Sequence, residues 1–225
     1  MENINYSLTK CYKSREINTN EKPLFKLNAF CINLERREKN MKFINKEWKD
    51  YCNIKRFNAL NNATASHIAL LKYIYSNKQR LQFPIIIMED DVYRKNNFTK
   101  YWNKLLDLKK CDYVSFDCFF LIFNNKNKSE NPSFVSLKEH RAMGFNVYYK
   151  RFFDRFKTIK ELDSILNRGV IDINFTHNPN FINYTPKEQV CRQIVTKYST
   201  TAKINTSHYI SYYEKGEDML KFYNS

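Results

Sequence analysis

The sequence predicts a single α/β domain, a mixed β-sheet with helices on its faces. Through the first half of the chain, short apolar segments alternate with segments of helical periodicity, which is typical of β-α-β units with parallel strands. Later strand-like segments are joined by shorter connections, which favours a mixed sheet. Apolar residues make up 43% of the 225 residues, enough for a sizeable core, and the length fits one domain.

The first half of the chain contains the clearer elements. Residues 1–26 are polar and without periodicity, so we expect a flexible or peripheral segment there. The predicted elements that follow are a strand over residues 27–34, a helix to about residue 50, a strand over residues 54–60, a helix over residues 67–79, a strand over residues 84–88 and a helix over residues 98–108. Apolar residues at helical spacing, such as Met41, Ile44 and Trp48, support the helices.

The second half gives less regular signals. Its predicted elements are a strand over residues 112–117 that residues 118–123 continue or leave, a polar loop over residues 124–132, strands over residues 134–137 and 145–149, a helix over residues 152–166, a strand over residues 169–174, a loop over residues 178–186, a short helix over residues 188–197 and a helix around residues 217–223. No internal repeat is visible.

Composition excludes several kinds of site. Only three glycines occur, which excludes a glycine-rich phosphate loop of the Rossmann or Walker type. The six cysteines form no CxxC pair, so we expect no zinc site and interpret them as reduced, mostly buried thiols. The N-terminus lacks the apolar segment of a signal peptide, and no apolar run approaches a membrane span. We therefore expect a cytoplasmic protein without a transmembrane segment.

The net charge of +15 indicates attraction to an anion such as nucleic acid, a phosphorylated sugar donor or a membrane surface. Lysine and asparagine abound throughout, however, as expected from an A/T-rich coding sequence. The lysines are scattered and form no basic block. We therefore expect no specific nucleic-acid partner.

Three consecutive carboxylates, Glu89, Asp90 and Asp91, directly follow the apolar strand at residues 84–88. Open α/β sheets bind ligands at the carboxyl ends of their strands. Adjacent carboxylates repel one another unless a cation or hydrogen-bond donors lie between them, and hard oxygen ligands suit Mg²⁺ or Mn²⁺ with a phosphate as further partner. The alternative is an acidic turn without a ligand. Extended geometry would place Glu89 and Asp91 on one side and Asp90 on the other.

Two arginines, Arg36 and Arg37, follow the first predicted strand and are suited to the phosphates or base of a nucleotide. The alternative is a solvated start of the next helix. His67 lies in the first turn of a predicted helix, where a packed, hydrogen-bonded histidine is more common than a ligand or a catalyst.

Short blocks in the same order and at similar spacing resemble glycosyltransferase family 25, which contains lipooligosaccharide and procollagen galactosyltransferases. The blocks are residues 32–37, 57–60, 66–68, 87–92, 144–149 and 170–172, and the resemblance covers roughly residues 28 to 200. Two departures are a shorter connection between Leu60 and Ser66, which lacks the family's "GE-x-G-C" segment, and Ile173 where the family commonly has tryptophan.

The resemblance implies a GT-A fold and an inverting, metal-dependent transfer of a sugar. The expected donor is a UDP-sugar carrying galactose or glucose, and the expected acceptor is a hydroxyl of a glycan or a protein. It further implies a nucleotide-sugar-binding half over residues 27–123 and an acceptor half with the C-terminal tail over residues 124–225.

The same resemblance assigns residue roles. Asp91, together with Glu89, is expected to hold Mn²⁺ or Mg²⁺, with His177 and His208 as further possible ligands. Asp172 is the first choice for the catalytic base and Asp117 the second. The residues expected to contact the donor are Asn33, Arg36, Arg37, Glu89 and Asp90, with Lys39 as a weaker candidate.

Three other functions stay open from the sequence. A metal-dependent nuclease or nucleotidyltransferase would use a carboxylate cluster to hold two ions, and it would need a further carboxylate beside the acidic turn. A catalytically inactive relative would bind the nucleotide sugar without turnover. A nucleic-acid binder would show steep salt dependence.

Overall fold

The computed structural model describes residues 21–60, 62–117, 119–124, 129–141, 143–167, 181–194, 215 and 217–220. Eight strands form one mixed sheet: β1 (Leu27–Asn33), β2 (Cys52–Asn58), β3 (Ile85–Glu89), β5 (Tyr113–Ser115), β6 (Phe119–Phe123), β7 (Phe134–Arg141), β8 (Phe145–Tyr148) and β9 (Asn183–Pro186). Two further strands, β4 (Val92–Arg94) and β10 (Cys191–Gln193), pair with each other. Within the described residues the longer helical elements are α2 (Glu38–Trp48), α3 (Ala63–Ser76), α4 (Phe98–Trp102), α5 (Lys150–Asp154) and α6 (Ile159–Leu166).

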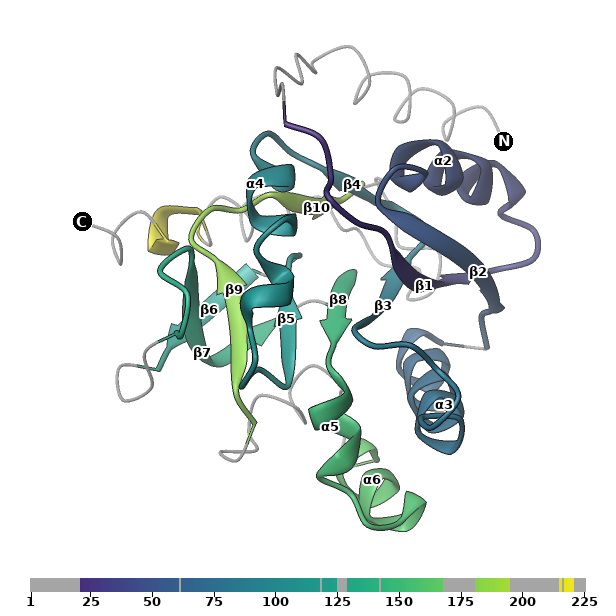
Figure 1. The fold of residues 1–225 in the computed structure, drawn as a ribbon. Coiled ribbons are helices and arrows are strands. Elements are labelled where there is room, and N and C mark those ends of the chain that lie inside the picture. The colour runs from purple at the N-terminus through teal and green to yellow at the C-terminus, as the bar shows by residue number, and fades with distance from the viewer. Residues whose placement is uncertain are drawn as a thin grey trace.

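The strand order of the large sheet is β2-β1-β3-β8-β5-β9-β7-β6, and helices flank it on its faces (Figure 1). β2, β1 and β3 run parallel, so their carboxyl ends meet at one edge, where Ile32 pairs with both Phe57 and Glu89. β8 runs antiparallel to β3 and β5, and β7 runs antiparallel to β6 and β9. The predicted mixed α/β domain, parallel in its first half, is confirmed.

Each face of the sheet carries its own apolar cluster. α2 and α4 contribute Trp48, Phe98 and Trp102 to one cluster, whereas α3, α5 and α6 contribute Leu71, Phe152 and Leu162 to the other. Successive residues of β3 alternate between them, because side chains along a strand point to opposite faces. Ile86 and Met88 lie in the first cluster, and Ile85 and Ile87 in the second. The apolar run before the carboxylates is therefore buried on both sides, as predicted.

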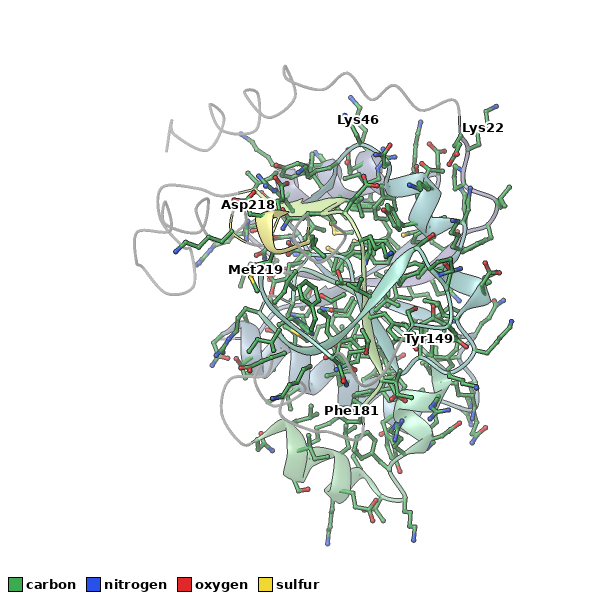
Figure 2. The ribbon with its side chains drawn as sticks, turned by 90° about the vertical axis from the view of Figure 1, so that its left-hand side faces the viewer. Lys22, Lys46, Tyr149, Phe181, Asp218 and Met219 are labelled. Atoms are coloured by element: carbon green, nitrogen blue, oxygen red, sulfur yellow. The ribbon has the colours of Figure 1, made fainter. Side chains whose placement is uncertain are left out.

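Aromatic packing also fixes the start of the described chain. The ring of Phe25 stacks on Trp102 with centroids 5.5 Å apart, and the Trp102 Nε1–H donates to the Phe25 carbonyl at 3.1 Å. Part of the predicted N-terminal segment thus packs on α4, while residues 1–20 lie outside the described residues. Phe181 is buried and Tyr149 is partly buried, whereas Lys46 points outward from α2 (Figure 2).

Two predictions in the second half are wrong. Residues 183–186, predicted as loop, form β9, because the backbone of this Asn- and Pro-containing segment pairs with β5 on one side and β7 on the other. Residues 191–193, predicted within a helix, form β10, because they pair antiparallel with β4. In both segments tertiary hydrogen bonding decides the structure and outweighs the local pattern.

Several predicted boundaries shift for local reasons. α3 begins at Ala63, since the Oδ1 of Asn62 accepts a hydrogen bond from the Ala65 N–H at 2.7 Å. The helix predicted over residues 152–166 is two helices, because Thr158 caps the second of them. The helix predicted over residues 98–108 ends at Trp102 and is followed by a 3-10 turn at Leu105–Asp107. β7 is longer than the predicted strand over residues 134–137.

Two expectations about composition can be compared with the described residues. Cys31, Cys52, Cys111 and Cys191 are buried, as predicted for most of the cysteines. Among the described residues, no helix is long and apolar enough to cross a membrane. The predicted strand over residues 169–174 lies outside the described residues, and residues 217–220 of the predicted C-terminal helix are helical.

Candidate functional site

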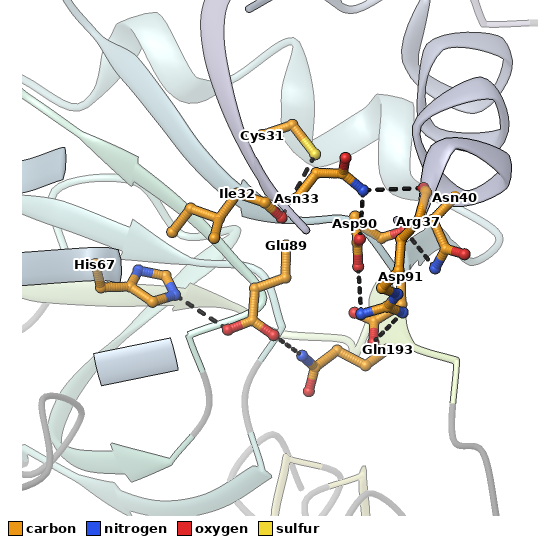
Figure 3. A network of polar contacts seen from close by, with 10 residues as sticks. All are labelled: Cys31, Ile32, Asn33, Arg37, Asn40, His67, Glu89, Asp90, Asp91 and Gln193. Carbon is orange, nitrogen blue, oxygen red and sulfur yellow. Dashed lines mark hydrogen bonds and ion pairs between the residues drawn. The ribbon is translucent and has the colours of Figure 1, made fainter. Parts of the chain in front are cut away.

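The acidic residues lie where β3 ends, at the edge shared with the carboxyl end of β1 (Figure 3). Glu89 is the last residue of β3, and Asp90 and Asp91 form the turn into β4. Backbone hydrogen bonds fix the turn, from the Glu89 N–H to the Gly144 carbonyl at 2.8 Å and from the Ile194 N–H to the Asp91 carbonyl at 2.7 Å. The turn therefore joins the parallel half of the sheet to β8 and β10.

Asp90 is a buried carboxylate with a donor on each oxygen. The Asn33 Nδ2 donates to its Oδ2 at 2.6 Å, and the Arg37 Nη1 lies 2.8 Å from its Oδ1. The Asn40 Nδ2 donates to its backbone carbonyl at 3.2 Å. Burial raises the pKa of Asp90 to about 6, although Arg37 and Asn33 act in the opposite direction. Asp90 thus ties the end of β3 to the end of β1 and the start of α2.

Glu89 also has a donor on each oxygen, but from a different side. The His67 Nε2 lies 3.0 Å from its Oε1, and the Gln193 Nε2 donates to its Oε2 at 2.5 Å (Figure 3). Burial alone would raise the pKa of Glu89, yet the hydrogen bond and charge of His67, assisted by Arg37 and Gln193, hold that pKa below its usual value. Glu89 is therefore held as a carboxylate.

Asp91 differs from its two neighbours. Its Oδ1 is buried and has no hydrogen-bond partner in the described part of the chain, and its Oδ2 lies 3.8 Å from the Arg37 Nη2. Burial raises the pKa of Asp91 well above its usual range, and the charges of Glu89, Asp90 and Asp117 add to this, while Arg37 opposes them. A carboxylate that is crowded by like charges and has a buried oxygen without a donor is a favourable place for a cation.

Asp117 is a fourth carboxylate at this place, and Gly144 makes room for it. The Asp117 side chain is fully buried, and its charge acts on Asp91. A Cβ added at Gly144 would overlap the Oδ2 of Asp117 and would also lie 2.9 Å from the Cγ of Gln193. Any side chain at position 144 would thus displace this carboxylate.

The predicted alternation of the three acidic side chains is wrong. Strand geometry ends at Glu89, so it does not extend through the turn. Arg37 contacts both Asp90 and Asp91, whereas Glu89 contacts His67 and Gln193 (Figure 3).

The structure places some predicted site residues at the turn and others elsewhere. Asn33, Arg37, Asp117 and the three consecutive acidic residues come together, whereas Arg36 and Lys39 are exposed on the α2 side. The predicted base Asp172 and the predicted ligands His177 and His208 lie outside the described residues.

Sequence reasoning missed three partners of the acidic turn. His67 is the packed, hydrogen-bonded histidine that the sequence predicts, but its pairing with Glu89 was not predicted. Asn40 looked like an ordinary polar residue of α2. Gln193 carried no signal, because it is separated from Glu89 by 104 residues and belongs to a strand of three residues.

The side chains present fit a divalent ion that arrives with a diphosphate. No group of three or more His, Cys, Asp or Glu side chains among the described residues is arranged to hold a metal ion by itself. Mg²⁺ at nucleotide sites, however, is usually held by one or two carboxylates together with phosphates of the substrate. The open Oδ1 of Asp91, with Asp117 near it, meets this requirement.

The solved structures similar to this chain include the three described below. No family model and no curated protein matches the chain. A197 from STIV has a TM-score of 0.49 at 14% identity, covering 77% of this chain and 88% of that one. HddC from Yersinia pseudotuberculosis, complexed with GMP-PN, has a TM-score of 0.39 at 9% identity, with coverages of 83% and 77%. The nucleoside-diphosphate-sugar pyrophosphorylase from Vibrio cholerae RC9 has a TM-score of 0.38 at 9% identity, with coverages of 80% and 75%. At TM-scores below 0.5 these likenesses establish neither a shared fold nor a shared function.

Proposed function

We propose that the chain is a metal-dependent, inverting glycosyltransferase of the family 25 type, with a GT-A fold. It would move galactose or glucose from a UDP-sugar to a hydroxyl of a glycan or protein acceptor. One observation carries the proposal: within the acidic turn, Asp91 keeps a buried oxygen without a partner in the described part of the chain, while both oxygens of Glu89 and of Asp90 have donors.

The residues of the turn would divide the work. Asp91 would hold Mn²⁺ or Mg²⁺, and a bound ion would balance the negative charge that develops on the leaving diphosphate. Arg37, whose side chain is 22% exposed and is held in place by Asp90, would contact the phosphates of the donor. Asn33 supports this arrangement by fixing Asp90 from the end of β1.

Asp117 is better suited to the charge balance of the site than to proton transfer. Its side chain is fully buried beside Gly144, so an acceptor hydroxyl would have to reach a carboxylate without contact to solvent. A catalytic base needs to lie within hydrogen-bond reach of the proton it removes. Asp172 therefore stays the proposed base for the acceptor hydroxyl.

The alternative is a metal-dependent nuclease or nucleotidyltransferase, and one observation favours it. Two-ion phosphoryl transfer needs a further carboxylate beside the acidic turn, and Asp117 supplies one near Asp91. The products distinguish the two functions, since a glycosyltransferase releases UDP from its donor whereas phosphoryl transfer releases a monophosphate.

Thermal unfolding with UDP and Mn²⁺ tests the proposal. At a ligand concentration of 100 times Kd, binding adds about 2.7 kcal/mol to the free energy of unfolding, which raises the melting temperature of a chain of this size by about 5 to 10 °C. The same shift should be absent in Asp91→Asn and present in Asp154→Asn, which changes an exposed aspartate paired with Lys150. The absence of a shift with every nucleoside diphosphate and metal tested would contradict the proposal.

Product analysis then identifies the reaction. Wild-type protein incubated with UDP-galactose or UDP-glucose and Mn²⁺ should slowly release UDP and free sugar when no acceptor is present. Release of UMP would support phosphoryl transfer instead. A protein that binds UDP with Mn²⁺ but releases neither product, even with candidate acceptors, would be a catalytically inactive relative.

A further inference from the structure

Glu89 is held by two side chains that come from distant parts of the chain. His67 belongs to the first turns of α3, and Gln193 is the last residue of β10. Their Nε2 atoms lie 3.0 Å and 2.5 Å from the two different oxygens of Glu89 (Figure 3). Because a carboxylate oxygen only accepts hydrogen bonds, both nitrogen atoms act as donors.

The imidazole of His67 has little freedom to move. Its side chain is 1% exposed, and the helix that carries it packs on the sheet through Leu70, Leu71 and Ile74. Near the start of that helix, the Ser66 hydroxyl accepts from the Leu60 N–H at 2.8 Å. The donor to Glu89 Oε1 is therefore fixed by the fold.

Gln193 is fixed through the same turn that carries Asp91. It pairs with Val92 in the ladder between β10 and β4, and the next residue, Ile194, donates to the Asp91 carbonyl at 2.7 Å. On the other side, the Nη2 of Arg192 lies 2.6 Å from Glu217 of the C-terminal helical segment. The strand that supplies this donor to Glu89 is therefore fixed on one side by β4 and on the other by Glu217.

Glu89 keeps capacity for further donors. Each of its oxygens already accepts one N–H hydrogen bond, and each has a second lone pair. Its side chain is 23% exposed, whereas that of Asp90 is 3% exposed. The donors that a nucleotide sugar presents in greatest number are hydroxyl groups, which pair well with an ionised carboxylate.

We propose that His67 and Gln193 are positioning residues that hold Glu89 as an acceptor for sugar hydroxyls of the nucleotide-sugar donor, which leaves the metal ion to Asp91. The inference rests on the proposed function. The hydroxyls belong either to the ribose or to the transferred hexose, and the ligands chosen below distinguish these two sources.

A matched pair of variants isolates the hydrogen bond from packing. His67→Gln retains an Nε2–H donor on a side chain of similar reach, whereas His67→Met fills similar volume without a donor. Gln193→Met removes the second donor from a position of intermediate exposure and carries the same test if His67→Met does not fold by circular dichroism. Asp91→Asn is the control for loss of the metal ligand.

Calorimetric titration with four ligands in the presence of Mn²⁺ separates the roles. The ligands are inorganic pyrophosphate, UDP, its 2′,3′-dideoxyribose analogue and the UDP-hexose that binds best. Since pyrophosphate has no sugar hydroxyl, we expect His67→Met to bind it like the wild type and Asp91→Asn to lose it. For the UDP-hexose we expect His67→Met to bind about tenfold more weakly and His67→Gln to stay within about threefold of the wild type.

The remaining two ligands identify the sugar. If Glu89 accepts from the ribose, His67→Met weakens UDP but not the 2′,3′-dideoxy analogue, which has no ribose hydroxyl. If it accepts from the hexose, His67→Met weakens only the UDP-hexose. Either pattern supports the inference.

Three results would overturn it while leaving the proposed function intact. The first is a loss of pyrophosphate binding in His67→Met as large as in Asp91→Asn, which would make Glu89 a metal ligand. The second is unchanged binding of every ligand by folded His67→Met. The third is an equal loss of UDP-hexose binding in His67→Gln and His67→Met, which would show that the hydrogen-bond donor at position 67 is not what matters. If the wild type binds none of the nucleotides, the proposed function fails, and this inference fails with it.

Discussion

The two aspartates of the turn, Asp90 and Asp91, are neighbours in sequence and opposites in their surroundings. Asp90 has a donor on each oxygen, and its contacts connect three elements of the parallel half. Asp91 is crowded by other carboxylates and keeps a buried oxygen for which the described residues provide no donor. Removing a carboxylate that has a donor on each oxygen leaves those donors unpaired, whereas removing one with an unpaired buried oxygen leaves no donor behind. The comparison therefore separates an anchoring residue from a binding residue.

The largest expected effect on stability is the loss of the anchor. Asp90→Ala leaves Asn33 and the partly buried Arg37 without their acceptor, and we expect the free energy of unfolding to fall by about 3 kcal/mol. Urea denaturation at pH 7.5 measures this, with Asp154→Ala as an exposed control expected to change it by less than about 1 kcal/mol. Equal small effects of both substitutions would show that Asp90 does not anchor the turn.

The second prediction concerns the space that Gly144 leaves for Asp117. Gly144→Ala should lower the free energy of unfolding by about 2 kcal/mol, because the added methyl group overlaps the Asp117 carboxylate. The double variant Gly144→Ala, Asp117→Ala removes that overlap and should lose less than the sum of the two single variants. Additive losses would mean that the two positions do not constrain each other.

The third prediction concerns His140, a buried histidine away from the acidic turn, which should make the free energy of unfolding depend on pH. Burial lowers the pKa of His140 to about 4, and the ring pairs with the Tyr113 hydroxyl at 2.9 Å. Between pH 6.5 and 4 the unfolded chain binds a proton that the folded chain does not, so stability falls as the pH falls. From pH 7.5 to 5.0 the wild type should lose about 2 kcal/mol more than His140→Gln. Parallel pH profiles of the two proteins would contradict this.

The smallest expected effect is a gain in stability, whereas the substitutions Asp90→Ala and Gly144→Ala should each reduce it. In the absence of metal and nucleotide, Asp91→Asn replaces a carboxyl group whose charged form the neighbouring carboxylates disfavour, so we expect the free energy of unfolding to rise by about 1 kcal/mol. Urea denaturation in the presence of a chelator measures it. A loss of stability comparable to that of Asp90→Ala would remove the distinction between the two residues.

The parallel half of the fold could be predicted because its signals are local. β1, α2, β2 and β3 each follow from apolar spacing, and parallel strands bring their carboxyl ends to one edge. That geometry alone places Asn33 and Arg37 beside the acidic turn. β9 and β10 could not be predicted in this way, because their backbone hydrogen bonds to distant strands, and not their own patterns, determine their structure.

The roles within the turn depend on side chains that no local pattern connects. Both oxygens of Asp90 have donors because the amide of Asn33 and the guanidinium of Arg37 both reach this carboxylate. Glu89 is held because β10 returns to the turn and brings Gln193 with it. The three acidic residues are equivalent in sequence, and their different partners in the fold make them distinct.

Calorimetric titration of UDP with and without Mn²⁺ tests the central claim most directly. We predict that the wild type and Asp154→Asn bind UDP tightly only with Mn²⁺, and that Asp91→Asn, although folded, binds at least about tenfold more weakly. Equal, Mn²⁺-dependent binding by Asp91→Asn and the wild type would contradict the account, because the open carboxylate of Asp91 would then not be the metal site.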